Sequence, residues 1–102
     1  MKLVALPEAI AEFQEAVAYY EKQRPGLGLD FFLAIEATVD FAAEAPGAGL
    51  SLPGPDPRFQ VRKYVVKRFP YLVFVAGEVS HRKIVAISHA ARRPGYWRDR
   101  LK

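Results

Sequence analysis

The chain has 102 residues, which suits a single domain spanning 1–102, because a second domain would need roughly another hundred residues. Hydrophobic residues make up 51% of the sequence, enough for a buried core, and the lack of cysteine excludes disulfide bonds and thiolate metal sites. No apolar run approaches the roughly 20 residues of a membrane span, and no signal-peptide pattern is present, so a cytoplasmic protein without membrane contact is expected.

The formal net charge of +4 is unevenly distributed along the chain. Residues 1–57 carry three basic and nine acidic side chains, a net charge of −6, whereas residues 58–102 carry twelve basic and two acidic ones, a net charge of +10. So basic a segment is typical of a surface that meets an anionic partner: RNA, DNA or an acidic protein. The alternative is that the two halves neutralise each other across the fold.

The N-terminal part predicts a short strand followed by a helix. The apolar run 3–6 stops at Pro7, which suits the first turn of a helix. The predicted buried stripe of this helix consists of apolar residues spaced by three or four: Ile10, Phe13, Val17 and Tyr20. The helix should end before Pro25, because the residue that precedes a proline avoids α geometry.

A second helix is predicted after a compact turn at residues 25–28. Its buried face is expected to hold five apolar residues: Phe31, Phe32, Ile35, Val39 and Ala42. It should end near Pro46, and the short loop predicts that the two helices pack as an antiparallel hairpin. Residues 46–57 contain four prolines and three glycines and indicate an irregular connector.

The second half of the chain predicts three strands. Residues 59–66 alternate with the period of a half-exposed strand, residues 71–75 are fully apolar like a central strand, and residues 83–89 form the third. The order β-α-α-β-β-β predicts an α+β fold, an antiparallel-rich four-stranded sheet with the helical hairpin on one face. The face that carries Arg62 depends on the register, since a slip of one residue exchanges it with Lys63.

Three segments combine aromatic, basic and turn residues in a fixed order. They are residues 19–28 (YYEKQRPGLG), residues 62–71 (RKYVVKRFPY) and residues 85–98 (VAISHAARRPGYWR). At this chain length they resemble the helical hairpin, the strand pair and the C-terminal ending of RelE/ParE superfamily toxins, also known as plasmid stabilisation proteins. The resemblance implies a growth-inhibiting toxin of a type II toxin–antitoxin system. It also implies a cognate antitoxin, whose acidic segment wraps the toxin in a hetero-oligomer.

The resemblance leaves two targets open. A ParE-like toxin would inhibit DNA gyrase through an exposed basic surface without chemistry of its own, and the ending at residues 92–97 is closer to that branch. The residues expected to bind the target are Arg92, Arg93, Tyr96, Trp97 and Arg98. A RelE-like toxin would instead act as an mRNA interferase that cleaves mRNA on the ribosome.

Cleavage of mRNA needs a proton donor or acceptor and cations that stabilise the phosphate. The catalytic candidates for this alternative are His89, because histidine commonly serves as an acid or a base, and Arg68 and Arg62, which would clamp a phosphate. The basic strands offer no carboxylate as a general base. Structural roles compete with each assignment: His89 would fix the C-terminal tail, Arg68 would hold the turn before Pro70, and Trp97 would cover the core.

A third possibility belongs to another class, a non-toxic basic module that binds nucleic acid. It would interleave basic and exposed aromatic side chains, and its binding would fall steeply with salt. No cofactor is expected. A metal site is not expected either, because the two histidines lie eight residues apart without an acidic cluster.

Overall fold

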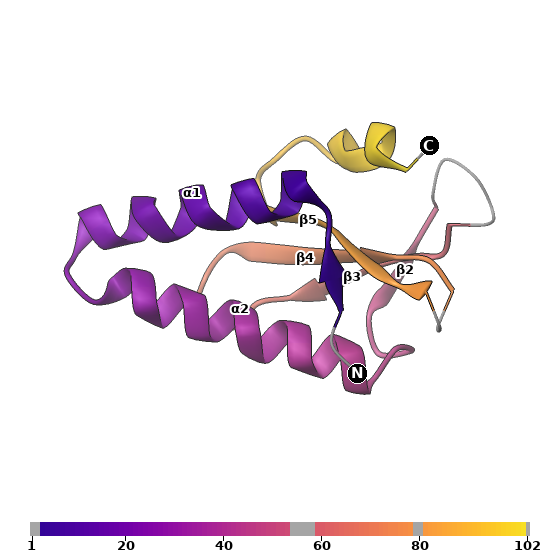
Figure 1. The fold of residues 1–102 in the computed structure, drawn as a ribbon, viewed down its shortest axis with the longest axis horizontal. Helices are drawn as coiled ribbons and strands as arrows, with labels where there is room; N and C mark the ends of the chain where they lie inside the picture. The colour runs from indigo at the N-terminus through magenta and orange to yellow at the C-terminus, as the bar shows by residue number, and fades with distance from the viewer. Residues whose placement is uncertain (1–2, 54–58, 79–80, 102) are drawn as a thin grey trace.

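A computed structural model describes residues 3–53, 59–78 and 81–101 and shows an α+β fold, in which α1 and α2 pack against a mixed sheet (Figure 1). In chain order the elements are β1 (Val4–Ala5), α1 (Pro7–Gln23), α2 (Leu27–Glu44), β2 (Leu50–Leu52), β3 (Val61–Val65), β4 (Tyr71–Ala76), β5 (Lys83–His89) and the 3₁₀ helix η2 (Tyr96–Arg100). None of the described helices is long and apolar enough to cross a membrane.

Within the described residues the sheet has five strands in the order β1-β5-β4-β3-β2, with β1 parallel to β5 and the other pairs antiparallel. The α+β class and the central place of β4 confirm the prediction, but the count of four strands is wrong. Residues 50–52 of the predicted irregular connector pair with β3 as β2. A strand of three residues is too short to show an alternating pattern. Residues 54–57, the end of that connector, lie outside the described part.

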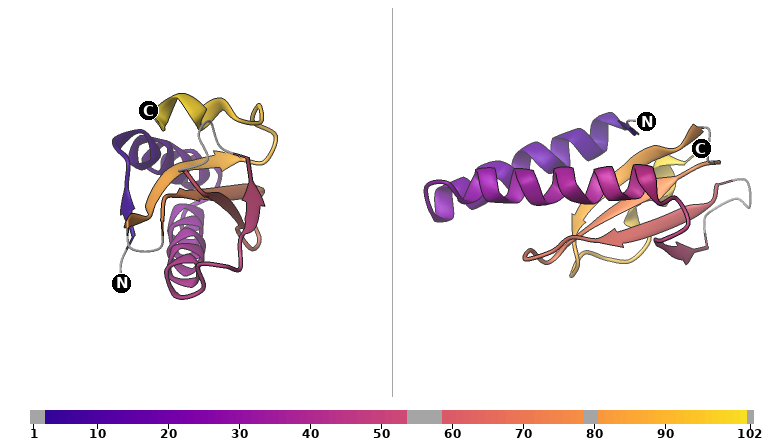
Figure 2. Two further views of the ribbon diagram at one scale, coloured as in Figure 1. Left: turned by 90° about the vertical axis from the view of Figure 1, so that its right-hand side faces the viewer. Right: turned by 90° about the horizontal axis from the view of Figure 1, so that it is seen from below.

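The two faces of the sheet carry separate buried clusters. The helical hairpin covers one face, as the view from below shows (Figure 2), and η2 packs against the other. The largest fully buried side chains between helices and sheet are Phe31, Ile35, Val73 and Val75. The cluster under η2 includes Val61, Phe74, Val85 and Trp97. The predicted position of the hairpin on one face is therefore confirmed.

The buried face of α1 is rotated from the predicted stripe. Ala9 and Ala16 are buried, whereas Ile10 is 44% exposed, and the other three residues of the stripe are only partly buried. The rotation turns Glu12 toward the sheet, where its side chain is 14% exposed. The small alanines let the helix approach the sheet closely, so they occupy the central line of contact instead of the larger residues.

On α2 the predicted buried face is confirmed with one exception. Phe31, Ile35 and Ala42 are buried, and Val39 is partly buried against the same core. Phe32 is 39% exposed, so its assignment to the buried face is wrong. Consecutive residues of an α-helix point about 100° apart, and a face centred on Phe31 does not also bury its neighbour.

A bulge in β5 changes which side chains face η2. Phe74 and Val75 of β4 pair with Ala86 and Ile84, so Val85 is an extra residue on β5. As a result Val85 and Ala86 both pack in the cluster under η2, whereas Ile84 packs on the helix side. The bulge therefore widens the apolar surface on which the C-terminal segment rests.

Candidate functional site

A cavity of about 180 Å³ lies between the sheet and the C-terminal segment, and we refer to it as the C-terminal cavity. Its apolar floor includes Leu52, Leu72 and Phe74. Its basic rim is formed by Lys63, Arg92, Arg93 and Arg98, with His89 beside them. Among the described residues that line it, none is acidic. The cavity therefore offers positive charge around an apolar base.

The C-terminal cavity brings together most of the residues that the sequence singles out. The predicted site residues that line it are His89, Arg92, Arg93, Tyr96, Trp97 and Arg98. Arg62 does not line it, because the register of β3 places Lys63 on the cavity side instead. The Arg62 guanidinium donates to the Gly49 carbonyl at 2.6 Å and to the Gly47 carbonyl at 3.3 Å.

Arg68 also lies outside the C-terminal cavity, at the turn between β3 and β4. Its backbone is left-handed, with φ of 73°, which is uncommon for a residue other than glycine. Its guanidinium lies 3.7 Å from the Asp30 carboxylate of α2 and 5.6 Å from the Phe69 ring centroid. These contacts fit a residue that holds the turn against the helical hairpin.

His89 is exposed at the end of β5, where the chain turns toward the cavity rim. Its Nδ1 accepts a hydrogen bond from the Ala91 amide at 3.0 Å, and its ring packs edge-on against Tyr71 with 5.5 Å between centroids. An Nδ1 that accepts from an amide leaves the proton of the neutral ring on Nε2. His89 therefore shapes the turn and keeps one ring nitrogen for a ligand.

Trp97 is a core residue of η2. It is 2% exposed, and its ring lies 5.4 Å from that of Phe74 between centroids. Only part of its surface reaches the cavity wall. To stack on a base or on a target, Trp97 would have to leave the core. The exposed cations of this segment that line the cavity are Arg92, Arg93 and Arg98.

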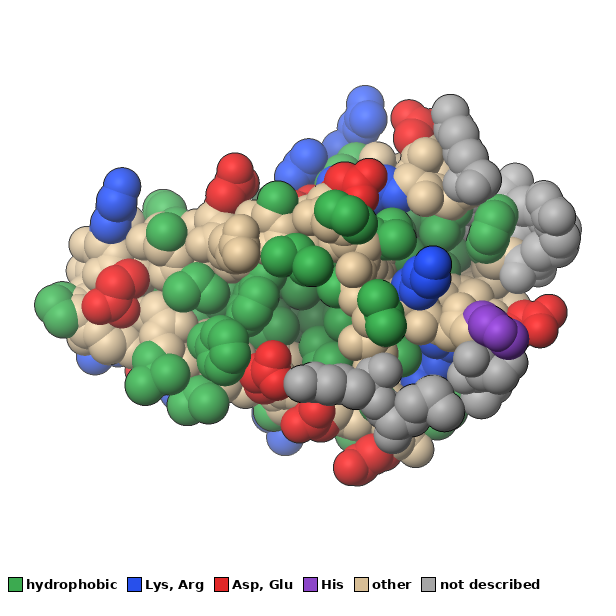
Figure 3. Space-filling view, viewed as in Figure 1, with side chains coloured by type: hydrophobic (Ala, Val, Ile, Leu, Met, Phe, Trp, Pro, Cys, Tyr) green, Lys and Arg blue, Asp and Glu red, His purple; other side chains and the backbone are tan. Residues whose placement is uncertain are grey.

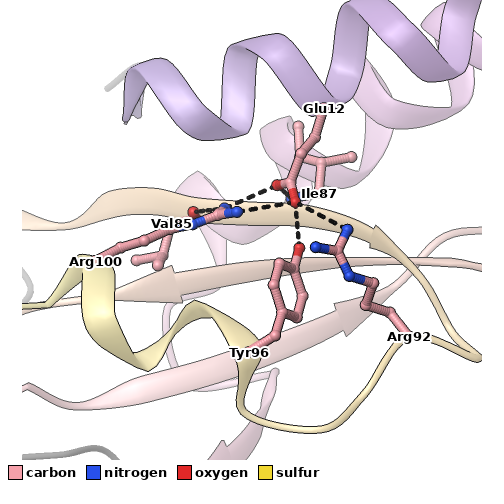
Figure 4. Close-up of polar contacts among 6 residues, drawn as sticks. All are labelled: Glu12, Val85, Ile87, Arg92, Tyr96 and Arg100. Carbon is pink, nitrogen blue, oxygen red and sulfur yellow. Dashed lines mark hydrogen bonds and ion pairs between the residues drawn. The ribbon is translucent and has the colours of Figure 1, made fainter.

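A carboxylate from α1, which the sequence analysis did not single out, contacts the C-terminal segment (Figure 4). The Tyr96 hydroxyl donates to Glu12 Oε2 at 2.5 Å. The Arg100 guanidinium donates to both carboxylate oxygens, at 2.9 and 3.1 Å, and Arg92 Nη1 lies 3.8 Å from Oε2. The Ile87 amide of β5 donates to Oε1 at 3.1 Å. Glu12 thus joins α1, β5 and the C-terminal segment.

Glu12 and Arg100 also occupy the edge of β5. The short strand β1 pairs only with the first two residues of β5, at Lys83 and Ile84. Further along the edge, the Ile87 amide donates to Glu12, and Arg100 donates to the Val85 carbonyl at 3.0 Å. Unpaired edge groups invite pairing with another chain, so these side chains protect the strand.

The ionisation of this cluster follows from its contacts. Burial by itself raises the pKa of Glu12, but hydrogen bonds from Arg100, Tyr96 and the Ile87 amide outweigh it, and the pKa lies below its ordinary value. Burial and then the bond to Glu12 raise the pKa of Tyr96 to about 12. Neither group transfers protons readily near neutral pH, so the cluster is structural.

Stacked cations complete the cluster. The guanidinium carbon of Arg92 lies 3.9 Å from the centroid of the Tyr96 ring, and that of Arg100 lies 4.9 Å from it. This arrangement holds Arg92 at the cavity rim.

One signal in the sequence points to Glu12: it lies three residues after Ala9 and four before Ala16, so a single acid shares a helix face with small residues.

In the described part of the chain, no group of three or more His, Cys, Asp or Glu side chains is placed to hold a metal ion. The chemistry offered by the C-terminal cavity is therefore that of exposed cations over an apolar floor, with one histidine.

Comparison of the chain with protein-family models, with curated proteins and with solved structures finds no match.

Proposed function

We propose that this protein is the toxin of a type II toxin–antitoxin pair, similar to the ParE branch of the RelE/ParE superfamily. In this proposal it inhibits DNA gyrase by binding through the C-terminal cavity. The observation that carries the proposal is the rim of Lys63, Arg92, Arg93 and Arg98 around an apolar floor, without an acidic residue in the described lining. Such a surface suits an anionic partner. The three resembling segments support the choice of superfamily.

Binding without catalysis fits these side chains better than RNA cleavage does. Tyr96 keeps its proton at neutral pH, and Glu12 already accepts hydrogen bonds from three residues. Arg68 lies at a turn outside the cavity. His89 favours a second candidate, a RelE-like mRNA endoribonuclease, because it lines the cavity and keeps Nε2 for a ligand.

A cognate antitoxin would neutralise the toxin by covering the basic rim or by wrapping the helical hairpin, which gives a hetero-oligomer. Figure 3 shows hydrophobic side chains gathered in the hollow between α1 and α2. Ile10, Phe32 and Leu33 on these helices are 44%, 39% and 55% exposed. A group of exposed apolar side chains marks an interaction surface, which supports contact with the hairpin, whereas an acidic segment suits the rim.

Induced expression in a bacterial host tests the proposal. We expect growth arrest, gyrase-linked DNA breaks and intact mRNA on ribosomes. The double variant Arg93→Gln/Arg98→Gln should relieve the arrest by at least about tenfold in surviving colonies, since each lost charged contact costs roughly 1.5–3 kcal/mol. The matched control Lys22→Gln/Arg24→Gln removes two exposed charges from the hairpin and should arrest growth like the unmodified chain.

Three other outcomes would each overturn the gyrase assignment. Cut mRNA that becomes intact with His89→Ala would establish the RelE-like alternative. A folded protein that binds naked DNA or RNA in a salt-sensitive way without arresting growth would be a nucleic-acid-binding module. A folded protein without either property would not be a toxin.

A further inference from the structure

A second cavity, of about 110 Å³, lies on the helix side of the sheet near the end of α2, and we refer to it as the Arg62–Arg82 cavity. Arg62 reaches it from β3, and Arg82 reaches it from the residue before β5. Gln60, Gly47 and Gly77 also line it. Two arginines from separate elements thus meet at one small cavity.

The guanidinium of Arg82 has donors without acceptors. Its Nη2 donates to the Ala42 carbonyl in the last turn of α2, at 2.6 Å. Its Nε and Nη1 are buried and have no hydrogen-bond partner in the described structure. A buried donor of a charged group is costly when it is unpaired, so the positive charge of Arg82 is only partly compensated by the protein.

Backbone carbonyls hold both guanidinium groups but do not neutralise them. Arg62 Nη1 donates to the Gly49 and Gly47 carbonyls, which follow α2 in the chain. The C-terminal end of α2 supplies a partial negative charge of about half a unit, less than the charge of two arginines. Within the described residues no ion pair joins either arginine to a carboxylate.

We propose that the Arg62–Arg82 cavity binds a small oxyanion, a phosphate or a carboxylate group, between the two guanidinium groups. Arginine pairs with both groups through charge-assisted hydrogen bonds, and its planar fork suits their oxygens. A volume of about 110 Å³ accommodates one such group. A Cβ at Gly47, which also lines the cavity, would meet no atom within 4 Å, so there is open space beside this glycine. The proposal does not depend on the toxin activity, since none of the four basic rim residues of the C-terminal cavity lines this one.

Titration of the full chain with inorganic phosphate, followed by the arginine Nε–H signals in NMR, tests this site. We expect saturable shifts of the Arg82 and Arg62 signals that sodium chloride at equal ionic strength does not produce. Acetate in a parallel titration distinguishes the chemistry: shifts of the same signals at lower concentration than with phosphate would assign a carboxylate. The reverse order would assign a phosphate group.

Substitutions test whether the anion binds at this site or is only attracted by the positive charge of the whole chain. Arg82→Gln should weaken phosphate binding at least tenfold, and Arg62→Gln should do the same and serves as a second variant if the first does not fold. Arg24→Gln, which removes an exposed charge from the hairpin, should leave the affinity unchanged. Shifts confined to Arg92, Arg93 and Arg98, or no saturable shift with either anion, would overturn the proposal.

Discussion

Glu12 receives hydrogen bonds from the Ile87 amide of β5 and from Tyr96 and Arg100 of η2. At the scale of single residues, this carboxylate is where α1, the sheet edge and the C-terminal segment meet. Arg100 has few alternatives as a partner, because its side chain is mostly buried beside Glu12 and the Val85 carbonyl. Removal of the negative charge therefore leaves a mostly buried cation without its counter-ion, which is more costly than the loss of an exposed pair.

Glu12→Gln should lower the free energy of unfolding by at least about 2 kcal/mol, the scale of a hydrogen bond to a charged group. Urea denaturation at pH 7 measures this change. Glu15→Gln is the matched control, because it removes the same charge from an exposed position of α1 and should change stability by less than about 0.5 kcal/mol. Equal effects of the two substitutions would contradict a special role for Glu12.

The stability difference between the unmodified chain and Glu12→Gln should depend on pH. Because the pKa of Glu12 is lower in the folded protein than its ordinary value, ionised Glu12 favours the folded state at neutral pH. This contribution is complete above the ordinary value of about 4.3 and is lost as the pH falls through the lower, folded pKa. The stability difference between the unmodified chain and Glu12→Gln should therefore shrink between pH 7 and pH 3. A constant difference would show that the charge of Glu12 is not responsible.

At the scale of elements, α1 caps α2. The Glu21 carboxylate of α1 accepts hydrogen bonds from the Gly26 amide at 3.1 Å and from the Gly28 amide at 3.0 Å. The first amides of a helix have no partner within it, and negative charge at this end is favourable. Gly26 has φ of 90°, so the chain reverses here in a conformation that other residues rarely adopt. The geometry of the hairpin follows from these two features.

Gly28→Ala should lower the free energy of unfolding by about 1–3 kcal/mol, as overpacking does in a close contact. A Cβ at this position would lie 2.9 Å from the Val17 carbonyl oxygen and 2.9 Å from Glu21 Oε1. Chemical denaturation measures the effect. The control is Gly47→Ala, where a Cβ meets open space, and it should leave stability unchanged or raise it by up to about 1 kcal/mol. Similar losses for both substitutions would mean that helix contact at Gly28 is not the cause.

At the scale of the whole molecule, the fold separates the charges that the sequence places in two halves. The helices carry acidic residues at the surface, including Glu8, Glu15, Asp40 and Glu44. The basic rim of the C-terminal cavity lies on the side of the sheet covered by η2, opposite the hairpin. The two halves therefore do not neutralise each other completely, and an anionic partner approaches a defined face.

Poly-aspartate should bind this face in a salt-dependent way. In NMR titrations of the backbone amides, we expect shifts at residues 89–98 and at Lys63, with little change in α1 and α2. Binding should weaken as salt rises from about 0.01 to 0.1 M, because the Debye length falls from about 30 to about 10 Å. Arg93→Gln/Arg98→Gln should weaken it more than Lys22→Gln/Arg24→Gln. Shifts spread evenly over both faces would contradict this separation of charge.

The sequence by itself determined the elements whose signals are local. Pro25 and the helical spacing before it predict the end of α1, which ends at Gln23. The apolar run at residues 71–75 predicts the central strand β4 (Tyr71–Ala76). These signals succeed because the spacing of apolar residues along a segment reports directly how that segment is buried. The positive charge of the C-terminal half could also be predicted, because it follows from the composition of that half alone.

Only the tertiary structure decided which distant residues meet. Glu12 and Arg100 are separated by 88 positions, and no local pattern pairs them. The register of β3 places Lys63, and not Arg62, in the lining of the C-terminal cavity. The three-residue strand β2 is defined only by its pairing with β3. Such choices depend on contacts between segments and on the exact alternation of a strand, where one residue of slip or one bulge moves side chains to the other face.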